Sequence, residues 1–454
     1  MKKINYRNAK ETISQRILAD GMDLIIDLDK SHGSWLVDGR DGREYLDLFS
    51  MFASMPVGYN HPYIIENKER LVRSTINKPT NSDIYSMEMA QFIETMGNVA
   101  QPSYLPHAFY VEGGALGVEN ALKTAFDWKV QKNISKGIEG KGSQIIHLSD
   151  CFHGRTGYTL SLTDSPDKRK TKFFPKFDWP RVINPKINFP MNDLNLEKVK
   201  SLEDESIRQI KDAIHDNEND IAALILEPIQ GEGGDNHFRC NYFQKLRQLA
   251  DENDFLLIYD EVQTGIGITG RMWAHQHFDD NANRYGKDKG KQVKTNTRPD
   301  IIAFGKKTQC CGIFAGTRID EIKDNVFSTS SRLNSTWGGS LSDMVRFTMY
   351  LEIIEKERLV DKAEKNGKYL LNKLEKLQDE FFPLVNNARG RGLFCAFDLP
   401  DSETRDSIVS GIMNEGAVIL GSGIKTMRFR PHLNISQSEI DLGISIITKA
   451  LERH

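Results

Sequence analysis

Two apolar runs that end in ionisable residues are the first candidates for chemistry in this sequence. The run from Phe255 to Tyr259 ends in Asp260 and Glu261, and a second run at 301–305 delivers Lys306. Both runs are typical of strands buried on both faces of a parallel sheet. Because ligands bind beyond the carboxyl ends of such strands, we expect Asp260 and Lys306 to lie at a ligand-binding edge.

An acid and a lysine in this setting indicate pyridoxal phosphate chemistry. The acid would pair with the pyridine nitrogen, and the lysine would form a Schiff base with the aldehyde. The same residues also fit a solvated strand end followed by two surface lysines, Lys306 and Lys307. Short motifs of this kind are hypotheses, so the rest of the chain has to separate the two interpretations.

A glycine-rich junction follows the predicted strand His107–Val111. Beyond Gly113, Gly114 and Ala115, apolar residues at 118, 121, 122 and 125 have the spacing of an amphipathic helix. Glycines at a helix start let the backbone approach an anion, and the free N–H groups there bind phosphate. The alternative is a tight turn that needs only a positive φ.

Two further predicted strands lead to candidate ligand contacts. After Gln144–Leu148 come Phe152 and His153, which could stack on a planar ring, and Arg155, which could form a fork with a carboxylate. Packing alone would also explain the aromatic pair. The strand Ile221–Glu227 ends in another carboxylate and precedes a glycine-rich turn that carries Glu232.

A competing motif favours a different class of enzyme. Gly265–Gly270 matches the G-x-G-x-x-G fingerprint and follows a strand, as in nicotinamide-dependent oxidoreductases. However, Arg271 and Trp273 follow at once, and no acid some twenty residues on completes a dinucleotide unit. We therefore treat this motif as incidental.

The elements that must position these residues suggest a large and a small domain. We predict a hairpin at 34–49, helices at 84–98 and 343–356, a surface loop at 164–195 and an exposed insertion at about 279–299. In the tail, strands at Leu393–Asp398, Ala417–Leu420 and Met427–Arg430 alternate with helices, and the last helix spans 439–452. We expect an N-terminal segment at 1–65 that joins the small domain, a large domain at 66–340, and a small α+β domain at 341–454.

Composition is that of an ordinary soluble protein. The 454 residues include 39% hydrophobic and 27% charged residues, with a formal net charge of −3, which indicates neither a nucleic-acid nor a membrane partner. No apolar run approaches the length of a membrane span. The N-terminus has no apolar core of a secretory signal, and the five cysteines lack metal-site spacing. We expect a reduced, cytoplasmic enzyme without a metal site.

A series of motifs in a fixed order resembles the class III (ω-) aminotransferases, a family of fold-type-I pyridoxal-phosphate enzymes. The motifs are Gly58–Pro62, Glu112–Glu119, Phe152–Gly154, Glu227–Glu232, Asp260–Gly265, Gly305–Lys306, Ser335–Gly339 and Arg428–Pro431. The resemblance implies an α/β fold-type-I transferase, with a mostly parallel sheet flanked by helices and a small α+β domain. The stretches VEGGALGVENALKTAFDWK, FHGRTGYTLSLT, AFGKKTQCCG and LNSTWGG are most similar to the branch that moves the ε-amino group of lysine to 2-oxoglutarate.

The resemblance implies a role for each matching residue. Lys306 would form the Schiff base, and Asp260 would keep the pyridine nitrogen protonated. Phe152, with His153 beside it, would stack on the cofactor ring, and Gln263 would hydrogen-bond near its 3-hydroxyl. Residues that would hold the cofactor phosphate are Gly114, Ala115 and, from the neighbouring subunit of a homodimer, Thr336. Many family members have Gly-Ser or Gly-Thr where this chain has Gly114-Ala115, so backbone amides would be the main donors here.

The resemblance also implies substrate contacts. Arg155, Glu232, Gln263, Asn334 and Arg428 would bind L-lysine and 2-oxoglutarate. Within the family, ornithine and 4-aminobutyrate remain alternative amine donors, although Arg155 and the lysine-type stretches weigh against them.

Overall fold

The structure, a computed structural model, describes residues 3–279 and 296–454 of the chain. Most of the insertion predicted at 279–299 therefore lies outside the described residues. At its described flanks, Asp279 and Thr297 are buried rather than exposed.

A seven-stranded sheet forms the centre of the larger body, in the order β3-β9-β8-β7-β6-β4-β5. Its strands are β3 (His107–Val111), β4 (Gln144–Leu148), β5 (Arg181–Val182), β6 (Ile221–Leu226), β7 (Leu256–Asp260), β8 (Ile301–Phe304) and β9 (Cys311–Ala315). β9 pairs antiparallel with β3 and β8, and the other neighbours pair in parallel. The predicted mostly parallel sheet is confirmed.

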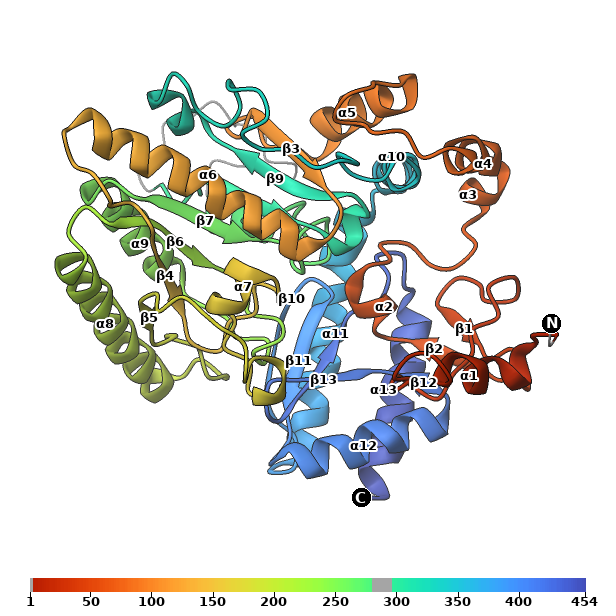
Figure 1. Cartoon of the computed structure of the whole chain (residues 1–454). Helices are drawn as coiled ribbons and strands as arrows, with labels where there is room; N and C mark the ends of the chain where they lie inside the picture. The colour runs from red at the N-terminus through yellow and green to blue at the C-terminus, as the bar shows by residue number, and fades with distance from the viewer. Residues whose placement is uncertain (1–2, 280–295) are drawn as a thin grey trace.

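Alternating residues of each central strand pack against helices on opposite faces of this sheet. On one face, Ile258 of β7 belongs to the same apolar cluster as Val118 and Ala121 of α6 (Gly114–Ser135). On the other face, Tyr259 packs with Phe243 of α9 (Cys240–Glu252). This two-sided burial explains the uninterrupted apolar runs in the sequence, and Figure 1 shows α6 lying across the strands.

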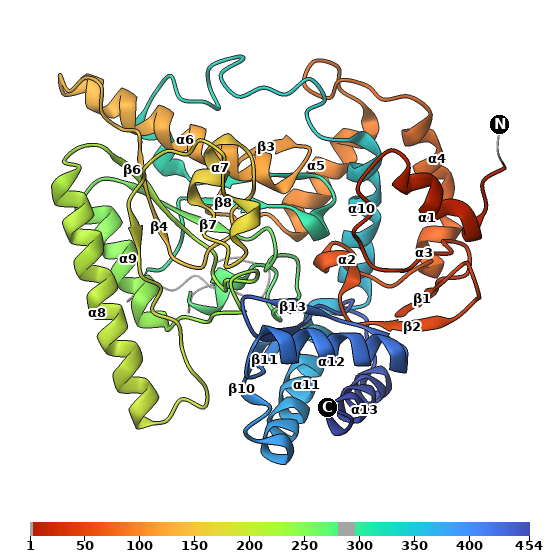
Figure 2. The ribbon, with the colours of Figure 1, turned by 60° about the horizontal axis from the view of Figure 1, so that its bottom comes forward.

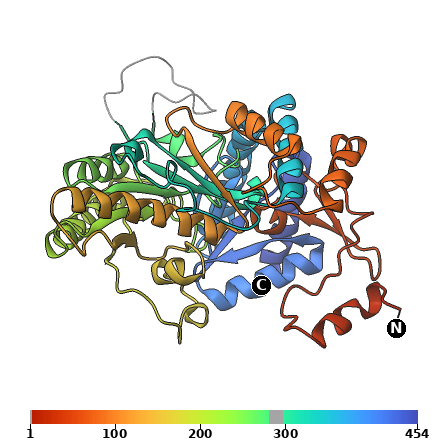
Figure 3. The same cartoon turned by 45° about the horizontal axis from the view of Figure 1, so that its top comes forward.

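The other helices of this body extend the two layers or pack beside them. They are α5 (Met87–Val99), α7 (Gly157–Leu162), α8 (Asp193–Asp216) and α10 (Leu341–Lys356). The helix predicted at 84–98 begins later, at Met87, because the Ser86 side chain caps it by accepting from the Met89 N–H at 3.1 Å. α5 and α10 pack side by side (Figures 1 and 3).

The segment predicted as a surface loop at 164–195 is more ordered than expected. It contains a 3-10 turn at Lys168–Lys170, the short strand β5 and the first turn of α8. Trp179 and Val182 within it are buried. A two-residue strand has too few positions to show an alternating pattern, so β5 leaves no periodic signal in the sequence.

The C-terminal part forms a second, smaller sheet in the order β10-β11-β14-β13, covered by helices. Its elements are α11 (Leu359–Phe381), β10 (Asn386–Arg391), β11 (Phe394–Asp398), α12 (Ser402–Glu415), β12 (Ala417–Val418), β13 (Leu420–Ser422), β14 (Thr426–Phe429) and α13 (Gln437–Glu452). The single strand predicted at 417–420 is wrong, because the chain changes sheets within it. β12 pairs with the N-terminal β2, whereas β13 pairs with β14.

The N-terminal segment returns to this smaller sheet body. The predicted hairpin is confirmed as β1 (Trp35–Val37) paired antiparallel with β2 (Glu44–Asp47), and β12 extends it in parallel. Figure 2 shows these red strands beside the blue helices of the C-terminus. The remaining N-terminal helices are α1 (Tyr6–Ser14), α2 (Ser50–Ala53), α3 (Pro62–Glu66) and α4 (Lys68–Ile76).

A buried ion pair joins the smaller sheet to the larger one. Arg430, just after β14, donates to both carboxylate oxygens of Asp235, at 2.9 and 2.6 Å. The two side chains are only 2% and 1% exposed. An ion pair this deeply buried is costly to break from one side, because the remaining charge stays desolvated.

We expect Asp235→Ala to lower the free energy of unfolding by about 3–5 kcal/mol, since it leaves Arg430 buried without its carboxylate. The measurement is the shift in denaturant midpoint and melting temperature. Asp212→Ala removes the partner of Arg208 in an exposed pair and should cost less than about 1 kcal/mol. Equal small shifts in both variants would contradict a structural role for the buried pair.

Candidate active site

A cavity of about 290 Å³ lies at the carboxyl ends of β6, β7 and β8. It brings together residues that the sequence places far apart. Those predicted as site residues are Gly114, Ala115, Phe152, His153, Arg155, Glu232, Asp260, Gln263 and Lys306. Its position is the one that the rule for open α/β sheets predicts.

Asp260 is fixed at the end of β7 by two hydrogen bonds. One oxygen accepts from His153 Nδ1 at 2.8 Å, and the other accepts from the Val262 N–H at 3.0 Å. Burial lowers the pKa of His153, but Cys151 and Asp260 outweigh burial and raise the pKa above its ordinary value. His153 therefore fixes the position of the Asp260 carboxyl group at the end of β7.

Lys306 and Lys307 lie in different environments although they are adjacent. Lys306 lines the cavity, and burial together with nearby Arg428 lowers the pKa of its amine. Lys307 is 2% exposed and donates to the backbone carbonyls of Gln263, at 2.8 Å, and Ala53, at 3.2 Å. Only Lys306 of the two is therefore placed to react with a molecule in the cavity.

The carbonyl of Ala53 that Lys307 contacts belongs to an unusual turn. Residues 50–53, assigned as α2, have φ values between 41° and 61° and form a left-handed turn without glycine. Such a conformation costs roughly 1–2 kcal/mol per residue. Asp47 accepts from the Phe49 and Ser50 N–H groups, and Gln309 donates to the Ser54 carbonyl at 2.6 Å. The strained turn is thus held from the same loop that carries Lys306.

The start of α6 provides the anion-binding element that the sequence predicts. Gly113 has a φ of 99°, and no side chain caps the helix at this end. The first N–H groups of an uncapped helix are free to bind an anion. Gly114 and Ala115 line the cavity at this point.

Glu227 is a cavity residue that the sequence analysis did not select. Its carboxylate accepts from the Phe152 N–H at 2.9 Å and the Gly231 N–H at 3.0 Å. Burial raises the pKa of Glu227 to about 7. Like Asp260, it follows a buried strand directly, and this position was the signal that could have identified it.

Gln263 presents one end of its amide to the cavity. Its carbonyl oxygen accepts from Arg430 Nε and Nη2, at 3.0 and 2.8 Å. Because its oxygen is occupied, the NH₂ group is the part of Gln263 that remains for a ligand.

Glu232 and Arg428 are paired beside the cavity. Arg428 Nη2 lies 3.1 Å from Glu232 Oε2, and the Arg428 side chain is 5% exposed. β14 supplies Arg428, whereas Glu232 lies in the turn after β6, so the pair joins the two sheets. Arg155 lines the cavity and is exposed, and among the described residues it has no ion-pair partner.

Three predicted site residues do not line the cavity of their own chain. Arg428 lies beside it, paired with Glu232. Thr336 and Asn334 lie on an exposed loop, where Asn334 Oδ1 accepts from the Ser335 N–H at 2.7 Å. Neither lines the cavity.

The cavity residues fit pyridoxal phosphate. The cavity offers free helix N–H groups for the phosphate, a carboxylate for the pyridine nitrogen and the NH₂ of Gln263 for the 3-hydroxyl. Phe152 supplies an apolar ring surface, and Lys306 supplies an amine with a lowered pKa. This donor set matches what the cofactor requires from its protein.

Other kinds of site find less support. Among residues 3–279 and 296–454, no group of three or more potential ligands could hold a metal ion, and no helix is long and apolar enough to cross a membrane. The Gly265–Gly270 motif leads through turns into a short 3-10 helix at Ala274–His277. A dinucleotide fingerprint requires a helix that begins at the glycines.

Comparisons with known proteins agree with this geometry. The family model for class-III aminotransferases matches residues 17–451. The L-lysine-epsilon aminotransferase of Mycobacterium tuberculosis is 47% identical over 445 residues, which cover 97% of this chain and 94% of that protein. The enzyme of the same name from Streptomyces clavuligerus is 43% identical over 452 residues, with 99% and 95% covered. A solved structure of the M. tuberculosis lysine aminotransferase superposes with a TM-score of 0.93 at 46% identity and covers 99% of this chain and 100% of that one.

We expect pyridoxal phosphate to become attached to Lys306 when the loaded protein is reduced with borohydride. Burial lowers the pKa of both lysines, but Lys306 faces the cavity, whereas Lys307 donates to backbone carbonyls. Peptide mass spectrometry should locate the cofactor on Lys306, Lys306→Ala should abolish attachment, and Lys307→Met should retain it. Attachment to Lys307 in the parent protein would overturn the assignment.

Proposed function

Because this chain belongs to the class-III aminotransferases, we propose that it transfers the ε-amino group of L-lysine to 2-oxoglutarate. The products are 2-aminoadipate 6-semialdehyde and L-glutamate. The identity of 43–47% to lysine-epsilon aminotransferases over nearly the whole chain supports this substrate. The observation in the site that carries the proposal is the Glu232–Arg428 pair beside the cavity of Lys306.

When bound, pyridoxal phosphate supplies an aldehyde that takes up the amino group and a ring that withdraws electrons from the reacting carbon. Asp260, oriented by His153, would stabilise a proton on the ring nitrogen of the bound cofactor by opposite-charge attraction. Lys306 would move the proton between the substrate carbon that carries the amino group and the aldehyde carbon of the cofactor. Its lowered pKa favours the neutral amine, which is the form that accepts a proton.

One cavity has to accept two different substrates. Lysine brings methylene groups to the position beside its ε-amino group, whereas 2-oxoglutarate brings a carboxylate to the same place. Arg428 binds that carboxylate in the second half-reaction. In the first half-reaction Glu232 neutralises Arg428, because an unpaired buried guanidinium would be costly.

Arg155 binds the carboxylate at the far end of either substrate. It lines the cavity, is exposed and has no carboxylate partner among the described residues, so its guanidinium is available for a ligand. A planar guanidinium suits bidentate recognition of a carboxylate.

The enzyme acts as a homodimer in which Thr336 and Asn334 complete the partner's site. Both residues are exposed in the single chain. Three large apolar side chains, those of Trp337, Tyr85 and Met87, are also exposed. Exposed apolar surface of this kind indicates a protein interface.

None of the five cysteines forms a disulfide, which suits the cytoplasm.

The experiment that tests the substrate compares lysine, ornithine and 4-aminobutyrate side by side as amine donors to 2-oxoglutarate. We expect kcat/KM to be at least about tenfold higher for lysine, since one methylene changes binding by roughly 10–200-fold. A preference for ornithine or 4-aminobutyrate would overturn the proposal while leaving the family unchanged.

Glu232→Ala and Arg155→Ala should separate the two half-reactions. Without Glu232, Arg428 is unpaired and repels the lysine ammonium. The rate of the lysine half-reaction should therefore fall about tenfold or more, while the 2-oxoglutarate half-reaction survives. Arg155→Ala should impair both halves. Single-turnover spectroscopy measures each half separately, and equal losses in both for Glu232→Ala would refute the switch.

A further inference from the structure

A third charged residue, Lys170, shares the Glu232 carboxylate with Arg428. Lys170 Nζ lies 2.6 Å from Glu232 Oε1, whereas Arg428 Nη2 lies 3.1 Å from Oε2. Lys170 belongs to the 3-10 turn Lys168–Lys170, in the segment that the sequence analysis treats as a surface loop. Its ammonium lies 6.0 Å from the centre of the Phe152 ring, so it is close to the cavity wall.

This sharing leaves the guanidinium of Arg428 half-paired. Arg428 Nη1 is buried and has no hydrogen-bond partner among the described residues. Arginine and carboxylate groups frequently form two parallel hydrogen bonds, which are stronger than one. Lys170 holds Oε1 of Glu232, and Arg428 bonds only to Oε2.

The two cations also keep Glu232 charged. Burial raises the pKa of Glu232, but Arg428 and Lys170 more than offset this effect, so that the pKa lies below its ordinary value. Glu232 therefore remains a carboxylate that both cations attract.

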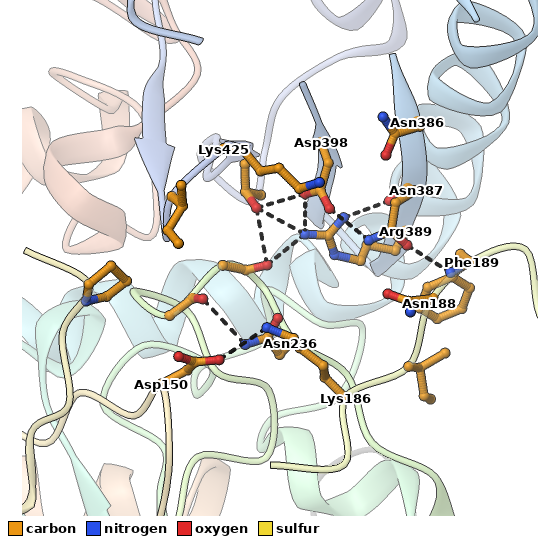
Figure 4. Close-up of a pocket in the computed structure, with 16 residues that line it drawn as sticks. Asp150, Lys186, Asn188, Phe189, Asn236, Asn386, Asn387, Arg389, Asp398 and Lys425 are labelled. Atoms are coloured by element: carbon orange, nitrogen blue, oxygen red, sulfur yellow. Dashed lines mark hydrogen bonds and ion pairs between the residues drawn. The ribbon is translucent and has the colours of Figure 1, made fainter. Parts of the chain in front are cut away.

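Hydrogen bonds hold the backbone of the turn around Glu232: the Gly231 N–H donates to Glu227 at 3.0 Å, and the Gly423 N–H donates to the Glu232 carbonyl at 2.8 Å. Arg389 donates to the carbonyls of Gly234 and Asp235, at 2.6 and 2.9 Å. It also pairs with Asp398, as Figure 4 shows. A Cβ on Gly233 would lie 1.9 Å from the Asp150 carbonyl oxygen. This glycine therefore serves close packing of the turn, and the movement of Glu232 is a rotation of its side chain.

We propose that Lys170 is a positioning residue that holds Glu232 partly away from Arg428 and thereby favours binding of the dicarboxylate substrate. The inference rests on the proposed function of the Glu232–Arg428 pair. Without Lys170, Glu232 closes onto both Nη atoms of Arg428 and becomes harder to displace. With Lys170, the incoming carboxylate first meets the unpaired Nη1, and Glu232 keeps a cationic partner after it leaves Arg428.

The test is calorimetric titration of the pyridoxal-phosphate-loaded enzyme with glutarate, a dicarboxylate that lacks the keto group and cannot react. In Lys170→Met, glutarate should bind about fivefold more weakly, whereas pentanoate, which lacks the second carboxylate, should change less than twofold. Lys170→Arg should restore glutarate binding, because it keeps the cation. Lys168→Met removes the same charge from the same turn and should change neither affinity.

A second background shows whether Lys170 acts through Glu232. In Glu232→Gln, adding Lys170→Met should change the glutarate affinity less than twofold, since no carboxylate remains to be held. An equal fivefold loss in that background would overturn the proposal, because Lys170 would then attract the ligand directly. Equal weakening of glutarate and pentanoate in Lys170→Met would also overturn it, because it would indicate a general structural effect.

Kinetics add a readout that a structural role would not produce. Lys170→Met should raise KM for 2-oxoglutarate about fivefold and leave kcat and the lysine half-reaction within twofold. If lysine proves not to be the amine donor, the substrate comparison shows that separately. The glutarate titration still decides the role of Lys170.

Discussion

Three ionisable groups meet at one buried edge of the central sheet, and the rest of the site depends on how their charges are compensated. β6, β7 and β8 deliver Glu227, Asp260 and Lys306 to this edge. A buried charge without a partner is costly, so each group needs either a nearby partner or a shift to its neutral form. His153 pairs with Asp260, backbone N–H groups of Phe152 and Gly231 bind Glu227, and burial near Arg428 shifts Lys306 towards the neutral amine. As a result, the carboxyl groups of Asp260 and Glu227 and the amine of Lys306 all face the same cavity.

The smaller sheet contributes the two arginines that lie beside the cavity. β14 and the residue after it carry Arg428 and Arg430, and each of these arginines meets an acid from the turn after β6. The two pairs differ in how completely the arginine is satisfied. Arg430 has both oxygens of Asp235 and the amide oxygen of Gln263, and it fixes the junction between the sheets. Arg428 has one oxygen of Glu232, and we propose that a substrate carboxylate replaces this less complete pairing.

The loop after β8 connects the reactive amine to backbone strain elsewhere. Lys307 and Gln309 donate to carbonyls at the end of the left-handed turn at residues 50–53, directly beyond Lys306. Strain of this kind persists only where the surroundings determine the conformation. Here the contacts from this loop and from Asp47 hold the turn, so that the N-terminal segment and the Lys306 loop are positioned together.

The sequence by itself determined the central strands, the helix after Gly113 and most of the residues that line the cavity. Those features follow from local patterns, because apolar runs, glycines and strand-end acids report their surroundings at short range. It also predicted Glu232 and Arg428 as substrate contacts, but only through resemblance to a family. Tertiary structure alone decided that the strand predicted at 417–420 divides between two sheets and that Lys307 turns away from the cavity. It alone showed that Lys170, 62 residues before Glu232, takes one oxygen of that carboxylate. Two loops that are distant in the sequence can share a charge only where the fold brings them together. The hydrophobic periodicity of the chain does not predict such long-range contacts.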